Sequence, residues 1–229
     1  MTMINMDNYA KKGNFYISFV PVHIDPSATN IKTSLVQFRA ALTDFKDAVS
    51  PSWDTKTVYG RMDPIATYQR TERKIDFSID ILAQDMEEAK ENLKKIRTLQ
   101  SYMYPTYETS TSDGFEVLSA SPLIRIGFAN WTPKSTQGTY GDPLLPLPAI
   151  DPNAAHNDIT LNYLLGYIDG SIDFAPDLKT PTFESFKGND SDIAALLPSK
   201  MSLSISFKVL HEEKVGWTAD TDGKFSWRS

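Results

Sequence analysis

A cluster of charged residues precedes a strand pattern in the segment VYGRMDPIATYQRTERKIDFSID, residues 58–80. With the glycine and proline beside them, its members are Gly60, Arg61, Asp63, Pro64, Arg70, Glu72 and Arg73. Residues of these types could bind a ligand or carry acid–base chemistry, or they could form a structural corner. Because glycine permits a tight turn and proline fixes its own φ, the motif GRMDPI predicts a rigid corner ahead of a long strand.

The arginines of this cluster favour a structural role. Arg61 or Arg73 could pair bidentately with Asp63 or Glu72, or could reach carboxylates of a neighbouring subunit. Neither arrangement involves catalysis. The candidate corner, placed within a subunit or between subunits, comprises Gly60, Arg61, Asp63, Pro64, Arg70 and Arg73.

Acidic residues and histidines elsewhere could also carry chemistry. Asp76, Asp80, Asp169 and Asp173 could supply a carboxylate pair of the kind that glycoside hydrolases use. Asp76 and Asp80, however, fall on the polar face of an alternating strand, where acids keep a sheet soluble and discourage edge pairing. The HEE triplet at 211–213 could suggest metal or acid–base chemistry. A strand-end histidine followed by a solvated acidic turn is the simpler interpretation.

The remaining catalytic signatures are missing from the sequence. It contains no nucleophile elbow, no phosphate-binding loop and no dinucleotide-binding glycine motif. It has no cysteine, which excludes disulfides, thiolate zinc sites and cysteine nucleophiles. The sequence therefore predicts a protein that is not an enzyme, with no catalytic residue, no cofactor and no metal site.

Aromatic residues form a second set of candidates. Four tryptophans and ten tyrosines could build a surface that binds a sugar or a protein, although aromatic residues are also ordinary core components. Trp217 and Trp227 lie in a tail-like segment, where a core role is harder to provide. The candidate partner-contact aromatics are Trp131, Tyr140, Trp217 and Trp227.

Charge and hydropathy limit the classes of partner. The 229 residues carry 29 acidic and 23 basic side chains, for a net charge of −6. Nucleic-acid binding needs a basic face, so specific affinity for DNA is not expected. The apolar runs fall short of the roughly 20 residues that a membrane helix requires, and the N-terminus lacks the apolar region of a signal peptide. The sequence predicts a soluble protein without a membrane partner.

Five segments are expected to form strands: residues 14–22, 73–82, 122–131, 164–175 and 200–211. The clearest period of two lies in KMSLSISFKVLH (200–211), where apolar residues alternate with serines and Lys208. RKIDFSIDIL (73–82) alternates in the same way, with lysine, serine and aspartates on one face. Such strands have one face on the core and one in water or against another chain.

One α-helix is expected at about 84–103, because apolar residues recur there at helical spacing. Asp85 as the N-cap, with Glu88 three residues later, resembles a capping box. Lys94, Lys95 and Arg97 follow toward the C-terminal end, where cations suit the helix dipole. Pro105 is expected to stop the helix.

Three segments are less regular. Residues 31–49 fit both a helical spacing and a strand period, so periodicity alone leaves helix and strand open. Residues 132–160 are rich in Pro, Gly, Asn and Asp and are expected to form a long functional or contact loop. The segment 218–229 is expected to be a flexible tail unless something binds it.

Several motifs occur together in an order that is similar to one known family. They are VYGRMDPIATYQRTERKIDFSIDI, EEAKENLKKIRTLQSYMYPTY, SPLIRIGFANW, LLGYIDGSIDFAPDL and LPSKMSLSISFKVLHEEKVGW. In this order they resemble the tail tube initiators, or baseplate tube caps, of contractile-tailed bacteriophages, which are relatives of the tail tube protein. The likeness covers roughly residues 35–131 and 161–217. Residues 132–160 depart from it as an insertion, and no LysM-type module is appended.

The resemblance implies a fold and a function. The fold would be mainly β (α+β), an antiparallel β-sandwich or partial barrel of the phage tail-tube type with one flanking helix, formed by residues 1–229 as a single domain. It favours strand and a long hairpin for 31–49. Six copies would form a ring whose strands join into an inner barrel, and DNA would pass through the lumen without specific binding.

The resemblance also implies partners and a location. The ring would contact the baseplate hub, the tail tube protein or a second initiator, and the baseplate wedges. The protein would assemble in the host cytoplasm and reside in the virion tail baseplate. Alternatives are another tail component, such as a distal tail or tail terminator protein, and, from a different class, a carbohydrate-binding tail protein.

Overall fold

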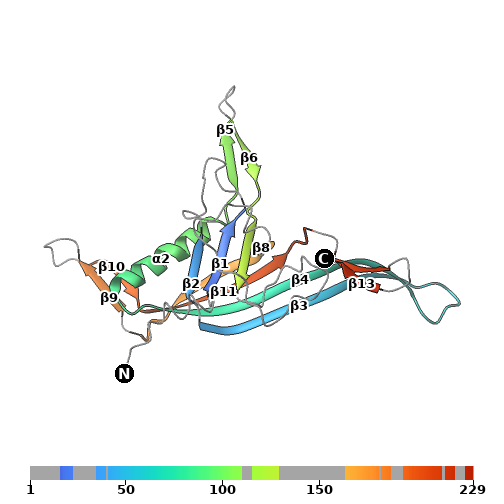
Figure 1. Cartoon of the computed structure of the whole chain (residues 1–229), viewed down its shortest axis with the longest axis horizontal. Helices are drawn as coiled ribbons and strands as arrows, with labels where there is room; N and C mark the ends of the chain where they lie inside the picture. The colour runs from blue at the N-terminus through green and yellow to red at the C-terminus, as the bar shows by residue number, and fades with distance from the viewer. Residues whose placement is uncertain are drawn as a thin grey trace.

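The structure is a computed structural model of the whole chain, dominated by antiparallel strands (Figure 1). It describes residues 16–22, 35–39, 41–109, 115–128, 163–180, 182–186, 193–212, 215–219 and 225–228. The elements in chain order are β1 (Tyr16–Pro21), β2 (Val36–Arg39), β3 (Ala41–Lys56), β4 (Ile65–Leu82), α2 (Met86–Ser101), β5 (Thr106–Thr109), β6 (Glu116–Ala120), β7 (Ile124–Phe128), β8 (Leu164–Pro176), β9 (Thr182–Phe186), β10 (Ile193–Pro198), β11 (Lys200–Val209), β12 (Gly216–Ala219) and β13 (Phe225–Arg228). The mainly β prediction is confirmed.

A seven-stranded sheet in the order β2-β1-β7-β8-β11-β4-β3 organises the molecule. Every neighbouring pair in it is antiparallel. The five expected strands all belong to this sheet as β1, β4, β7, β8 and β11. β4 begins at Ile65 rather than near residue 73, because its first residues pair with the far end of β3.

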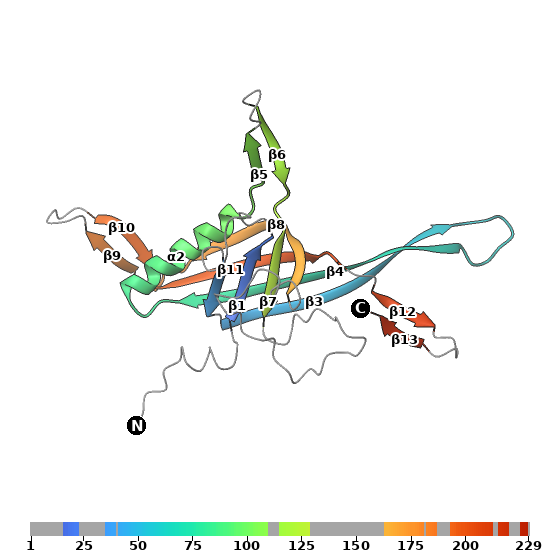
Figure 2. The same cartoon turned by 45° about the horizontal axis from the view of Figure 1, so that its top comes forward.

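The sheet is strongly curled. Its two outer strands, β2 and β3, are consecutive in the chain, since β2 ends at Arg39 and β3 begins at Ala41. A flat sheet of this size would be roughly 29 Å wide at the usual strand spacing, whereas the link between Arg39 and Ala41 can span only about 7 Å. The short strands β1, β2 and β7 accordingly cross over the long strands β3, β4 and β11 (Figures 1 and 2).

The core fills the space inside this curl. Phe19 of β1 stacks on Phe77 of β4 with 6.2 Å between ring centroids, although three strands separate β1 from β4 in the sheet. Phe45 of β3 likewise faces Phe128 of β7 at 6.5 Å. The alternation predicted for β4 and β11 is confirmed, because every second residue of Ile75–Ile81 and of Met201–Val209 is buried. The two halves of the sheet thus share one apolar interior.

Helix α2 covers one end of this core. Ile96 and Leu99 belong to the core cluster, and the helix contacts β2, β9 and β10. Asp85 caps it as predicted, accepting a hydrogen bond of 2.7 Å from the Glu88 N–H. The return bond of a capping box would come from the Asp85 N–H, but Glu88 accepts from the Gln84 N–H at 2.8 Å instead. The helix ends at Ser101, ahead of Pro105.

Residues 36–39 and 41–49 are strand, so the helical alternative is wrong for this described part of 31–49. The helix-like spacing of Leu42 and Phe45 comes from a β-bulge. The register slips between Leu42 and Asp44, which leaves Thr43 as an extra residue and returns Leu42 and Phe45 to the core side. Strand pairing with β1 and β4 therefore overrides the local pattern.

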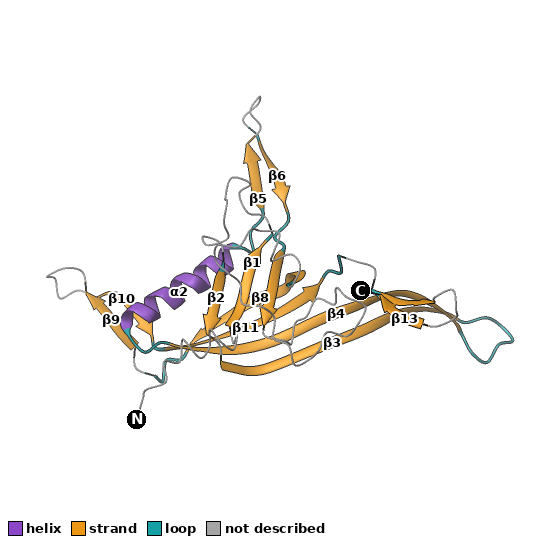
Figure 3. Ribbon diagram, in the orientation of Figure 1, coloured by secondary structure: helices purple, strands orange, loops and turns teal. Residues whose placement is uncertain are grey.

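Among the described residues, three hairpins besides the far end of β3–β4 stand out from the curled sheet: β5–β6 and β9–β10 (Figure 3), and β12–β13 (Figure 2). The last of these includes part of the segment 218–229, for which a flexible tail is expected. Thr218, Ala219 and Phe225–Arg228 belong to this two-stranded sheet. The predicted loop at 132–160 lies outside the described residues.

Candidate functional site

The four long strands β8, β11, β4 and β3 present one side to water, which we call the polar face. It is the side opposite the core, and its side chains are half-buried or exposed. They are Asp44, Lys46, Glu72, Lys74, Asp76, Ser78, Asp80, Asp169, Ser171, Asp173, Lys200, Ser202, Ser204, Ser206 and Lys208. Serines and aspartates thus dominate this face, which also carries Ala48, Leu82, Tyr167 and Ala175.

The acids of the polar face are held by neighbouring strands. Asp80 accepts a 2.7 Å hydrogen bond from Ser202 Oγ and lies 2.9 Å from Lys200 Nζ. These two β11 side chains, the Ser202 hydrogen bond first, lower the pKa of Asp80 below its usual 3.8. Asp80 is therefore a stable carboxylate, whereas a glycosidase acid needs a raised pKa.

A second set of pairs holds the other end of the same face. Glu72 lies 3.0 Å from Lys208 Nζ and 2.5 Å from Arg70 Nε. These hydrogen bonds, Lys208 first, lower the pKa of Glu72, and the Glu72 carboxylate raises the pKa of Lys208. Lys74 Nζ lies between Asp76 and Asp169, at 3.7 and 3.9 Å. Three lysines of the polar face are thus engaged by carboxylates.

A shallow hollow of about 340 Å³ marks the middle of the polar face. It forms where β8 bulges opposite Ser206, with Gly170 at a φ of +104°. Asp169 and Asp173 lie in it, but Asp173 accepts a hydrogen bond from Ser171. Within the described part of the chain, no three His, Asp or Glu side chains are arranged to hold a metal ion. The hollow offers hydration rather than a built ligand site.

The predicted corner lies at the tip of the β3–β4 hairpin. The Arg61 N–H donates to the Val58 carbonyl at 3.2 Å, and Gly60 takes a φ of +81°, which favours glycine. Pro64 immediately precedes the first residue of β4. Arg61 and Asp63 are exposed and make no ion pair with any residue that the structure describes.

Within the subunit, the structure gives Arg73 a different partner from those expected. Arg70 and Arg73 lie inside β4 and not in the corner. Arg73 pairs bidentately with Asp47 of β3, at 3.0 and 2.6 Å, instead of with Asp63 or Glu72. The sequence could not show this pair because the register of β3 against β4 brings together residues 26 positions apart.

The outer part of this hairpin, residues 49–71, is exposed at every position, and we call it the arm (Figure 1). Trp53 packs edge-on against Tyr68 at 5.5 Å, which stiffens the two strands. At its tip Tyr59 and Met62 are fully exposed. Other exposed apolar residues of the arm are Val49, Val58 and Ile65. So much apolar surface on a projecting hairpin is typical of a binding element.

The candidate aromatic contacts are only partly placed. Trp217 and Trp227 are direct register partners in the β12–β13 hairpin. Trp131 and Tyr140 fall outside the described residues. The exposed Trp53, Tyr59 and Tyr68 of the arm were not among the candidates, although the position of Tyr59 directly before Gly60 was a usable signal.

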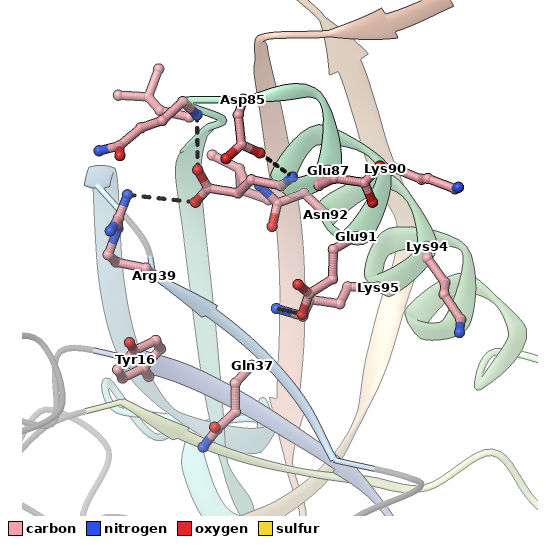
Figure 4. Close-up of a pocket in the computed structure, with 14 residues that line it drawn as sticks. Tyr16, Gln37, Arg39, Asp85, Glu87, Lys90, Glu91, Asn92, Lys94 and Lys95 are labelled. Carbon is pink, nitrogen blue, oxygen red and sulfur yellow. Dashed lines mark hydrogen bonds and ion pairs between the residues drawn. The ribbon is translucent and has the colours of Figure 1, made fainter. Parts of the chain in front are cut away.

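An open groove of about 800 Å³ between α2 and the strands β1 and β2 was also not expected (Figure 4). Its charges cancel locally. Glu88 lies 3.6 Å from Arg39, and Glu91 lies 2.8 Å from Lys95. The groove therefore does not collect one sign of charge for a ligand.

Sequence reasoning missed a buried ion pair. Arg125 of β7 is 4% exposed, and its guanidinium donates to Glu212 at 2.9 and 2.5 Å. Glu212 was expected in a solvated acidic turn; it instead ties the segment after β11 to β7. A buried arginine in a short apolar strand has no sequence signature without its partner.

Comparison with known protein families and with curated proteins finds no match for this chain. Within the described residues, no helix has the length and apolar character needed to span a membrane.

Proposed function

We propose that this protein is a ring-forming structural component of a phage tail baseplate, of the tail tube initiator type. It has no catalytic role in this proposal and needs no cofactor. The observation that carries the proposal is the long sheet β8-β11-β4-β3. It combines a continuous polar face with two edges that are unpaired among the described residues, one along β3 and one along β8 beyond Gly166.

The two edges are suited to pairing between copies. Among the described residues β3 pairs only with β4, and beyond Gly166 β8 pairs only with β11. Because the four strands alternate in direction, β3 of one copy and β8 of the next would meet antiparallel. The two edges are different surfaces, so the contact would be heterologous, and a heterologous contact forms a ring when its rotation closes. Six copies would then form one continuous inner barrel.

The polar face would line the lumen of that barrel. Its serines and aspartates suit an aqueous channel, and its acids outnumber its lysines. Phosphate binding depends on available cations. Since carboxylates engage Lys74, Lys200 and Lys208, DNA could pass without being held. The curled sheet with α2 beside it would be a partial barrel of the tail-tube type.

The arm would join successive rings. It projects along the long strands, away from the curled core (Figures 1 and 2). In a ring built from these strands, the exposed Tyr59 and Met62 would reach the tail tube protein or a second initiator. The opposite end of the ring would face the hub, with the wedges outside, and the ring would adapt the threefold hub to the sixfold tube. The protein would act in the virion and assemble in the host cytoplasm.

Native mass spectrometry of the purified protein, alone and with its hub and tube proteins, tests this function. A hexamer that binds both partners is expected. A protein that remains monomeric with both partners present would contradict the proposal. Immunogold labelling of intact virions separates an initiator at the baseplate from a distal tail or terminator protein at another position.

A further inference from the structure

The β5–β6 hairpin stands apart from the rest of the molecule. β5 and β6 contact chiefly each other, and both views show them clear of the other strands (Figures 1 and 2). An isolated two-stranded hairpin is marginally stable in water. Its order therefore calls for a covering surface from outside the subunit.

The side chains of the β5–β6 hairpin indicate the chemistry of the surface that would cover the hairpin. Large apolar residues of the hairpin and its base are strongly exposed: Tyr104 75%, Tyr107 61%, Phe115 73%, Val117 59% and Leu118 58%. The sequence from Tyr104 to Ala120 contains three acids and no lysine or arginine. Exposed apolar patches of this kind mark protein contacts. The complementary surface is apolar and basic.

The chain itself carries such a surface on α2. Lys90, Lys94 and Arg97 are exposed along one side of the helix, and none of them pairs with a carboxylate in the described part of the chain. Lys95, by contrast, pairs with Glu91 (Figure 4). The one acid in line with the stripe, Glu87, lies at the N-terminal end. Positive charge is thus concentrated in the C-terminal half of α2.

An apolar residue begins this stripe. Met86, the first residue of α2, is 38% exposed and lies one helical turn before Lys90. The surface formed by Met86, Lys90, Lys94 and Arg97, here called the α2 surface, matches the hairpin in charge and adds Met86 as an apolar contact.

We infer that the β5–β6 hairpin of one copy docks on the α2 surface of a second copy. The hairpin projects away from the helix of its own subunit in both views, so its own α2 surface is left for a neighbour. The two surfaces differ, and such a contact propagates in one direction around a ring. The inference rests on the proposed ring and adds to it a second contact, independent of the β3 and β8 edges.

Cross-linking tests this contact directly, because the chain has no cysteine. Two single variants, Glu116→Cys and Lys94→Cys, are mixed and treated with a short bismaleimide. A covalent heterodimer is expected on a denaturing gel and by intact mass. Glu116→Cys mixed with Lys46→Cys, a lysine of the polar face, is the matched control. Yields no higher than in this control would overturn the inference.

Charge exchange provides a second measurement. Glu116→Lys and Lys94→Glu should each weaken self-association roughly fivefold, and the double variant should restore it. No restoration would count against the contact. A hexamer without the heterodimer cross-link would overturn this inference and leave the proposed function standing. The cross-link in an open chain of copies would support the contact and contradict the ring.

Discussion

On the scale of single residues, the polar face is a surface of mutually neutralised charges. Lys200 with Asp80 and Lys208 with Glu72 are ion pairs open to solvent, and such pairs contribute little to stability. Their larger effect is on the field above the sheet, since a lysine that binds a carboxylate is less available to a phosphate. In the proposed lumen, these pairs would limit the binding of phosphate more than they would stabilise the fold.

The Asp80 carboxylate makes stability depend on pH in a defined direction. Its pKa is lowered in the folded state, so its contribution is fully present above the unfolded value of 3.8 and is lost as the pH falls through the folded value. Asp80→Asn should therefore reduce the free energy of unfolding at neutral pH, and the difference from wild type should shrink in acid. Urea denaturation across a pH series measures it.

Ser202→Ala provides the comparison for this prediction. It removes the hydrogen bond that contributes most to the lowered pKa but keeps the carboxylate. It should reproduce part of the pH effect. A deficit in Asp80→Asn that stayed constant from neutral to acid pH would contradict the assignment.

Gly166 is a position where a single methyl group is not tolerated. A Cβ there would lie 2.1 Å from the Lys208 carbonyl oxygen, which belongs to the backbone of β11 and cannot move aside cheaply. Gly166→Ala should cost about 2 kcal/mol or more in the free energy of unfolding. Gly216→Ala, which meets nothing within 4 Å, is the matched control and should change it by less than about 1 kcal/mol. Equal effects in a urea titration would show that the packing argument fails.

On the scale of elements, the features that could be predicted from the sequence are those that short local patterns determine. The alternation in β4 and β11 and the Asp85 cap of α2 follow from neighbours in the chain. The bulge at Thr43 and the Arg73–Asp47 pair follow from strand register, which no short pattern contains. The consecutive outer strands that curl the sheet, and the buried Arg125, depend on contacts across the whole fold.

The arm exposes apolar side chains that contribute nothing to the core of its own subunit. Tyr59→Ser and Met62→Ser should leave the free energy of unfolding within about 0.5 kcal/mol of wild type, because both side chains are fully exposed. Both variants should reduce binding to the tube protein or second initiator.

Arg61→Ala and Asp63→Ala are expected to impair ring or baseplate assembly with the subunit still folded.

Leu178→Ser is the control for the arm variants. Leu178 is 83% exposed and lies after β8, far along the chain from the arm. It should affect neither stability nor assembly. Sedimentation of mixtures with the partner proteins measures the difference. If the arm variants assemble as well as Leu178→Ser, the arm does not contact the partner proteins.

On the scale of the whole molecule, the surfaces that the subunit leaves uncovered fit one proposed assembly. The polar face and the edges of β3 and β8 that are unpaired among the described residues belong to one long sheet, and the arm extends that sheet lengthwise. In the proposed contact, β5–β6 of one copy would dock on α2 of another. Unpaired edges and exposed hairpins favour aggregation in a chain that works alone. The proposed ring would use all of them.

The most direct test of this account is a cryo-electron microscopy map of the protein assembled with its hub and tube proteins. The account predicts a sixfold ring in which β3 of one copy pairs with β8 of the next and in which Asp76, Asp80 and Asp173 line the lumen. A ring whose polar face is turned outward, or a map in which the protein remains a monomer on the hub, would contradict it.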